Sequence, residues 1–156
     1  MNSGREKEAR GKVARVRHSI SIDVPAERVY PLISSGRAHT QWWAADVTDI
    51  DSSGVVDLGF FDRATLYRLK PVPLAGPMEA EWLCETGKEW CGTKLIFELT
   101  EKDGHTLVRF THADGEVETD YFASSTTTWG ELMFRLKGAA EGKNPGPLFS
   151  HTGLAY

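Results

Sequence analysis

The sequence predicts an α+β fold in which a curved antiparallel sheet of six to seven strands wraps around one long C-terminal helix. Three stretches carry this prediction. Residues 78–112 contain three consecutive segments in which apolar side chains alternate with charged or polar ones, as they do in half-buried strands. Residues 13–24 alternate in the same way. Residues 122–140 instead repeat their apolar side chains at helical spacing, so they predict an amphipathic helix that covers the sheet.

The elements between the first strand and the central three are shorter. In chain order, the patterns predict a helix beginning at residues 24–27, a second short helix near 37–42, and strands over 47–51, 55–61 and 64–69. Pro31 shortens or kinks the first of these helices, because proline removes a helical hydrogen bond. Three prolines in residues 71–77 make that stretch a loop. Asp103-Gly104 is expected in the turn between the last two strands, since this pair accepts positive φ.

The long C-terminal helix has a strong half and a weak half. Trp129 lies in the middle of its apolar stripe and is expected to face the sheet. The run Ser-Ser-Thr-Thr-Thr over residues 124–128 has poor intrinsic helix propensity. Either tertiary packing holds that half of the helix in place, or the helix begins after it. Gly142 is expected to end the helix.

The chain divides into three parts. Residues 1–12 are predicted to form a disordered basic arm, residues 13–142 one domain, and residues 143–156 a C-terminal tail. Residues 1–17 carry six Lys and Arg against two Glu, a charge of +4, whereas the whole chain carries −4. The remainder therefore carries −8, and an acidic body argues against nucleic acid as a partner.

Several kinds of site and location are not expected. The sequence has no run of 18 apolar residues and no secretory signal, so neither a membrane span nor export is predicted. Two cysteines are too few for a disulfide framework, which fits a cytoplasmic protein. No set of His, Cys, Asp and Glu has metal-ligand spacing, so no metal is assigned. No cofactor is assigned either. The sequence has no nucleophile elbow, phosphate-binding loop or dinucleotide fingerprint, which weakens the interpretation as an enzyme without excluding it.

Several segments resemble one superfamily in their order and spacing. They are the first strand running into Val24-Pro25-Ala26-Glu27-Arg28-Val29-Tyr30, the pair Trp42-Trp43, the motif Trp90-x-Gly92-Thr93, and the closing stretch Trp129-x-x-Leu132-x-x-x-Leu136-Lys137. Together they resemble the START/Bet v-like (SRPBCC) superfamily, in the subgroup named for the activator of the heat-shock-protein-ninety ATPase. The resemblance covers residues 13–147 and implies a helix-grip fold with an internal cavity. Tyr30 departs from the tryptophan usual at its position.

The resemblance and the strand periodicity together indicate a ligand cavity between the sheet and the long helix. The residues expected at this site are Trp42, Trp43, Phe60, Trp82, Phe97, Phe110, His112, Trp129 and Met133. His112 would be the polar group in an otherwise apolar wall, and a core histidine with its hydrogen bonds satisfied is the alternative for it. Plain core packing is the alternative for the tryptophans, because aromatic side chains dominate protein cores. His18 is expected on an inward strand face, whereas His39 and His151 are expected in loops.

Members of the superfamily include lipid and hormone binders, polyketide cyclases and a chaperone activator, so the resemblance implies three candidate functions. The first is binding of a small apolar or amphipathic molecule in the cavity, by a monomer or a homodimer. The second is a cyclase- or hydrolase-like enzyme that uses His112 or an acidic neighbour. The third is a module that acts on a chaperone. A preformed cavity above about 300 Å³ would favour the first two, and a filled core with an exposed apolar patch would favour the third.

Overall fold

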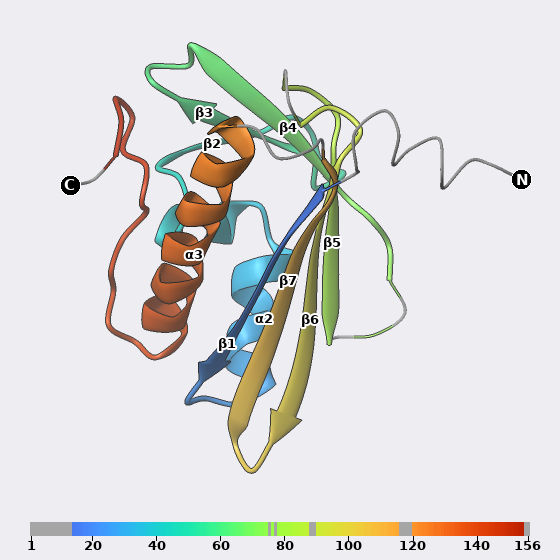
Figure 1. Ribbon diagram of the computed structural model, residues 1–156, viewed down its shortest axis with the longest axis vertical. Helices are drawn as coiled ribbons and strands as arrows, with labels where there is room; N and C mark the ends of the chain where they lie inside the picture. Colours follow the sequence, from blue (N-terminus) through green and yellow to red (C-terminus); the bar gives the residue numbers. More distant parts are fainter. Residues whose placement is uncertain (1–13, 75, 77, 88–89, 116–119, 155–156) are drawn as a thin grey trace, which may run out of the picture.

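One seven-stranded antiparallel sheet and one long helix dominate the computed structural model, which describes residues 14–74, 76, 78–87, 90–115 and 120–154 (Figure 1). In chain order the elements are β1 (Ala14–Ile22), α2 (Ala26–Ser34), η1 (Arg37–Gln41), β2 (Asp46–Asp49), β3 (Val56–Phe60), β4 (Thr65–Pro71), β5 (Glu79–Cys84), β6 (Lys94–Lys102), β7 (His105–Gly115) and α3 (Asp120–Ala140). Across the sheet the strands lie in the order β1-β7-β6-β5-β4-β3-β2, so the first strand pairs with the last. In Figure 1 the C-terminal segment runs along the outer side of α3.

The predicted fold class is confirmed, since every described strand pair is antiparallel and two short helices follow β1. The differences are local. The second short helix, η1, forms where it is predicted but is a 3-10 helix of five residues. Helix α2 begins directly after Pro25, whose backbone is extended. It spans nine residues and carries Pro31 on its exposed side.

The hairpin between β6 and β7 forms as the sequence predicts. Lys102 pairs with His105, which leaves Asp103-Gly104 as a two-residue turn with φ angles of 53° and 78°. Positive φ at both positions is the geometry of a type I′ turn, whose twist matches the twist of the strands. The resulting register sets Phe97 opposite Phe110, and both rings are buried.

The core between the sheet and the helices is aromatic. The largest side chains that are almost fully buried are Trp42, Trp43, Trp82, Trp129, Phe97 and Phe110. Two of the indole N–H groups also form hydrogen bonds with backbone carbonyl groups in the last turn of α2. The Nε1 atoms of Trp42 and Trp82 donate to the carbonyl oxygens of Leu32 and Ile33, at 3.0 and 2.8 Å. Because the last carbonyl groups of a helix have no partner within it, these hydrogen bonds fix α2 against the core.

A mostly covered carboxylate fastens the C-terminal end of α3 to the segment that follows β1. Glu141 Oε2 accepts hydrogen bonds from the Asp23 backbone N–H at 2.9 Å and from Lys137 Nζ at 2.6 Å. Lys137 Nζ also donates to the Ser21 carbonyl oxygen at 2.8 Å. The hydrogen bond from Lys137 is the main reason why the pKa of Glu141 falls to about 2, so this carboxylate stays ionised at neutral pH.

We expect Glu141→Gln to lower the free energy of unfolding by about 1–2 kcal/mol, because two hydrogen bonds lose their charged acceptor. Chemical denaturation at neutral pH measures this change. Glu131→Gln is the matched control, since Glu131 pairs with Arg135 at 3.6 Å on the same helix but is 40% exposed. There we expect a change below about 0.5 kcal/mol, as for other surface ion pairs. Equal losses in the two variants would show that the Glu141 contacts do no more than a surface pair.

The segment after α3, which is predicted as a tail, packs against α3 and the residues that follow η1. Leu148 is buried, and the Phe149 backbone N–H donates to the Trp43 carbonyl oxygen at 2.9 Å. Arg135 Nη1 donates to the three carbonyl oxygens of residues 145–147. These contacts hold the segment beside the residues that follow η1, where it reaches the cavity described below.

The basic arm expected over residues 1–12 lies outside the described residues. None of the helices in the described part of the chain combines the length and the hydropathy that crossing a membrane requires.

Candidate functional site

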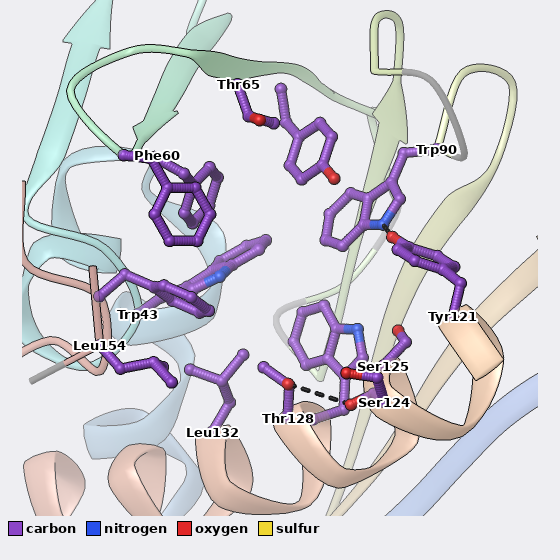
Figure 2. A pocket seen from close by; sticks show the side chains of 14 residues that line it. Trp43, Phe60, Thr65, Trp90, Tyr121, Ser124, Ser125, Thr128, Leu132 and Leu154 are labelled. Atoms are coloured by element: carbon purple, nitrogen blue, oxygen red, sulfur yellow. Dashed lines mark hydrogen bonds between the residues drawn. The ribbon is translucent and has the colours of Figure 1, made fainter. Parts of the chain in front are cut away.

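A cavity of about 390 Å³ lies between the β3–β4 hairpin, the first half of α3 and the C-terminal segment. Its walls are formed by Trp43, Phe60, Phe61, Thr65, Tyr67, Trp90, Tyr121, Ser124, Ser125, Thr128, Trp129, Leu132, Phe149 and Leu154 (Figure 2). Phe61, Tyr121 and Leu154 are 51, 40 and 48% exposed, so they form the rim. Trp43 and Trp129 are buried and form the deep part of the wall. The cavity therefore meets solvent at its rim and is apolar at depth.

Stacked aromatic rings form the wall toward the sheet. The Tyr67 and Trp90 rings are nearly parallel, with centroids 4.2 Å apart and an interplanar angle of 5°. Trp90 in turn faces Trp129 at 6.0 Å and 22°. Gly87 makes this arrangement possible, because a Cβ atom at that position would overlap the Tyr67 ring. A wall of fixed ring faces suits a flat apolar molecule.

One hydrogen bond closes a side of the cavity. The indole Nε1 of Trp90, in the connection between β5 and β6, donates to the hydroxyl of Tyr121 in the first turn of α3. Figure 2 shows the two rings next to each other at this side. The hydrogen bond ties the β5–β6 connection to the helix and so fixes the width of the cavity there.

Hydroxyl groups are concentrated on the wall that α3 contributes. Tyr121, Ser124, Ser125 and Thr128 all line the cavity, and their spacing places them on one side of the helix (Figure 2). Within the described residues, the lining contains no Asp, Glu, Lys, Arg, His or Cys. No group of three potential metal ligands occurs elsewhere in that part of the chain either. The site is therefore uncharged, with its oxygen atoms gathered mainly along one wall.

The β3–β4 turn at the rim has strained backbone geometry. Phe61, Asp62 and Arg63 are consecutive non-glycine residues with φ angles of 54°, 54° and 68°. This left-handed region costs such residues roughly 1–2 kcal/mol each, so other contacts must hold the turn. The Asp62 N–H donates to the His151 carbonyl oxygen at 2.7 Å, and Phe61 lies edge-on to Phe149 with centroids 6.5 Å apart. The C-terminal segment thus supports the turn that carries Phe61 to the rim.

The structure brings together three of the nine residues expected at the site. Trp43, Phe60 and Trp129 line the cavity. Trp42, Trp82, Phe97, Phe110 and Met133 do not line it and are each at most 2% exposed. These five side chains fill the deeper space between the sheet and the helix, where the sequence analysis expects a cavity. Strand periodicity identifies side chains that face inward, but it does not tell whether the space they face stays empty.

His112 lies behind the aromatic wall. Its ring centroid is 4.7 Å from that of Trp90, and its Nε2 atom is 2.8 Å from the Thr93 Oγ1. Because the Thr93 hydroxyl donates its hydrogen to the Trp90 carbonyl oxygen at 2.6 Å, its oxygen accepts from Nε2–H of His112. Burial lowers the pKa of His112 to about 4, so the ring is neutral at pH 7. In this position His112 supports Trp90 and is separated from the cavity by it.

The residues that sequence reasoning missed are Phe61, Thr65, Tyr67, Trp90, Tyr121, Ser124, Ser125, Thr128, Leu132, Phe149 and Leu154. Trp90 could have been identified from the sequence, since it belongs to the motif Trp90-x-Gly92-Thr93, one of those that resemble the superfamily. The run of hydroxyl residues over 124–128 was a second signal of the site, because residues of low helix propensity are unexpected inside a long helix unless they have another role. Phe149 and Leu154 had none, since the segment after α3 has no periodic pattern.

The prediction that His39 lies in a loop is wrong. His39 belongs to η1 and is fully buried, with its ring packed against those of Trp42, Trp43 and Trp82 at 5.7, 5.1 and 5.1 Å. Neither ring nitrogen has a hydrogen-bond partner among the described residues. Burial lowers the pKa of His39 to about 3, so this ring is neutral as well. Its carbonyl oxygen accepts from the Trp43 N–H at 2.8 Å, in a tight turn that directs the ring inward.

Replacing His39 with leucine is expected to raise the free energy of unfolding by about 1–2 kcal/mol. Leucine has a similar volume, and it removes polar nitrogen atoms whose burial without partners costs about 1–3 kcal/mol. Urea denaturation at pH 7.5 measures the change. His151→Leu, at an exposed position, is the control and should stay within about 0.5 kcal/mol of the parent protein. A loss of stability in His39→Leu would mean that the nitrogens are satisfied, for example by a buried water molecule.

Comparisons with known proteins agree with the architecture. No protein-family model matches the sequence, and no curated protein matches it. Among solved structures, the Aha1 dimer from Colwellia psychrerythraea has a TM-score of 0.71 and 24% sequence identity, over 83% of this chain and 98% of that chain. The chain therefore has the START-like, Aha1-like fold.

Two further structures extend the likeness. A START superfamily protein from Mycobacterium smegmatis gives a TM-score of 0.64 at 14% identity, over 81% of this chain and 97% of that chain. DynU16, from the dynemicin biosynthetic locus, gives a TM-score of 0.67 at 16% identity, over 87% of this chain and 50% of that chain. At these identities the likeness shows the fold alone, and it agrees with the expected helix-grip fold.

Proposed function

We propose that the protein binds a small, uncharged apolar or amphipathic molecule in the cavity beside α3. The single observation that carries this proposal is the cavity itself, a preformed space of about 390 Å³ with eight aromatic residues among its fourteen lining residues. Ligand sites in proteins are typically apolar concavities of about 300–1,000 Å³ with a few polar groups. Affinity would come mainly from removing the apolar surface of the ligand from water, at about 25 cal/mol per Å².

The chemistry of the wall favours binding over acid–base catalysis. General acids and bases in enzymes are most often imidazoles, and otherwise carboxylates, amines, thiols and the phenol of tyrosine. Among the described residues of the lining, only the phenols of Tyr67 and Tyr121 belong to this set, and no imidazole, carboxylate, amine or thiol lines the cavity. The absence of a lining charge also disfavours a charged ligand, because a buried charge without a partner is costly. The solved structures with this fold are named for different proteins, so their names do not indicate one function. The proposal therefore rests on the cavity and not on the likeness in fold.

Fluorescence titration with N-phenyl-1-naphthylamine, a neutral aromatic probe, tests the proposal. Thr128→Trp places a large side chain in the cavity, and Thr127→Trp places the same side chain at the neighbouring exposed position, outside the lining. We expect saturable binding to the parent protein and to Thr127→Trp, and at least tenfold weaker binding to Thr128→Trp. Circular dichroism and melting curves should show both variants folded.

Two results would contradict the proposal. One is the lack of saturable binding to the folded parent protein at high micromolar probe. The other is equal binding to Thr128→Trp and Thr127→Trp, which would place the probe outside the cavity.

A further inference from the structure

The run of hydroxyl residues in α3 places poor helix formers where alanine would stabilise the helix more. Residues 124–128 all carry a hydroxyl group, yet α3 continues through them without interruption from Asp120 to Ala140. A helix that accepts five such residues in succession is held by packing at other positions. Intrinsic helix propensity therefore does not explain the run.

The five residues fall into three groups by the surroundings of their side chains. Ser124, Ser125 and Thr128 line the cavity. Thr127 is exposed, and its hydroxyl donates to the Ala123 carbonyl oxygen at 3.3 Å. Thr126 does not line the cavity, and its hydroxyl donates to the Phe122 carbonyl oxygen at 3.0 Å. Its own carbonyl oxygen is 3.1 Å from Nε2 of His18 on β1. Only the first group can contact a molecule in the cavity.

The cavity-facing hydroxyls retain hydrogen-bonding capacity. No described residue forms a hydrogen bond with the side-chain oxygen of Ser124 or of Ser125. The Thr128 hydroxyl donates to the Ser124 carbonyl oxygen at 3.1 Å, which leaves its oxygen able to accept. In Figure 2 these oxygens lie along the α3 side of the cavity, across from the rings of Phe60 and Trp43. One wall therefore offers donors and acceptors, and the opposite walls offer ring faces.

We infer that Ser124, Ser125 and Thr128 form a polar recognition edge, and that the ligand is a flat, uncharged ring system with hydroxyl or carbonyl oxygens along one side. This inference rests on the proposed function. The ring plane packs against the aromatic wall, and its oxygens exchange hydrogen bonds with the α3 hydroxyls. A purely hydrocarbon ligand would displace water from the hydroxyls of Ser124 and Ser125 and would offer them no hydrogen bond in return. A charged ligand would find no opposite charge in the lining.

Paired probes test the recognition edge. Pyrene and 1-hydroxypyrene share one flat ring system and differ by a single hydroxyl group. We compare their binding to the parent protein and to the triple variant Ser124→Ala/Ser125→Ala/Thr128→Ala, using probe fluorescence at neutral pH. Alanine is a better helix former, so the melting temperature of the triple variant should be unchanged or higher. We expect its affinity for 1-hydroxypyrene to fall about three- to tenfold, the usual effect of one neutral hydrogen bond, while pyrene binding changes less than about twofold.

Thr127→Ala is the matched control, because Thr127 lies in the same run but outside the cavity. It should leave the affinity for both probes unchanged. If both probes bind the parent protein and the triple variant weakens them equally, or weakens neither, the recognition edge is overturned while ligand binding stands. If neither probe binds the folded parent protein saturably, the proposed function and this inference fail together.

Discussion

Trp129→Ala is expected to lower the free energy of unfolding by about 3–5 kcal/mol, the usual cost of truncating a large buried aromatic side chain. Trp129 is 1% exposed and lies at the centre of the aromatic core. Its ring stacks on Phe110 at 4.1 Å and contacts Trp43 at 5.0 Å. Alanine would leave a cavity that the surrounding rings cannot fill, because they are fixed by their own contacts. A loss of this size is a large share of the 5–15 kcal/mol that stabilises a typical domain.

Phe134→Ala provides the control for this prediction. Phe134 lies on the same helix but is 67% exposed, so its truncation should change the free energy of unfolding by less than about 0.5 kcal/mol. Urea denaturation of the two variants measures both values. If Trp129→Ala lost no more stability than Phe134→Ala, α3 would not be the cover of the sheet.

The second large effect concerns pH. Between pH 7 and pH 4 the protein is expected to lose on the order of 5 kcal/mol of stability through two buried histidines. The pKa of His39 is about 3 and that of His112 about 4 in the folded state, against about 6.5 in the unfolded chain. Across this window the unfolded state binds two protons that the folded state does not. Stability is therefore complete above pH 6.5 and falls as the pH falls, by about 1.4 kcal/mol per pH unit for each histidine.

Urea denaturation at half-unit pH steps measures this slope. His39→Leu should reduce it by about half between pH 6 and pH 4, since one of the two protons is removed, and His151→Leu should leave it unchanged. A stability that stays constant between pH 6.5 and pH 4 would show that the two rings are protonated as easily in the folded state as in the unfolded chain.

The parts of the fold that the sequence predicts well are those with a long periodic pattern. The alternation in β1, β6 and β7 and the helical repeat in α3 each run over nine residues or more, and each element forms where the pattern lies. Helix η1 has five residues and no period, so the inward position of His39 has no signal in the sequence. Burial of that ring depends on a tight turn whose direction is set by tertiary packing.

The site was harder to predict, because its position depends on which of the spaces between inward-facing side chains stay unfilled. Trp82 and Phe97 face inward as their strands predict, but the space they face is occupied by other rings, such as Trp42. The cavity instead opens where the β3–β4 hairpin diverges from α3, and Phe149 of the C-terminal segment completes it. Sheet curvature and the course of that segment are long-range properties, so no local pattern marks them.

The five tryptophans provide the most direct test of the proposed cavity, because each indole N–H gives its own signal in a proton–nitrogen correlation spectrum. Trp43, Trp90 and Trp129 line the cavity, whereas the indoles of Trp42 and Trp82 are hydrogen-bonded to α2 in the filled core. On titration with N-phenyl-1-naphthylamine, the first three signals should move together and saturate, and the other two should stay in place. Movement confined to the signals of Trp42 and Trp82, or no movement at all, would contradict ligand binding in this cavity.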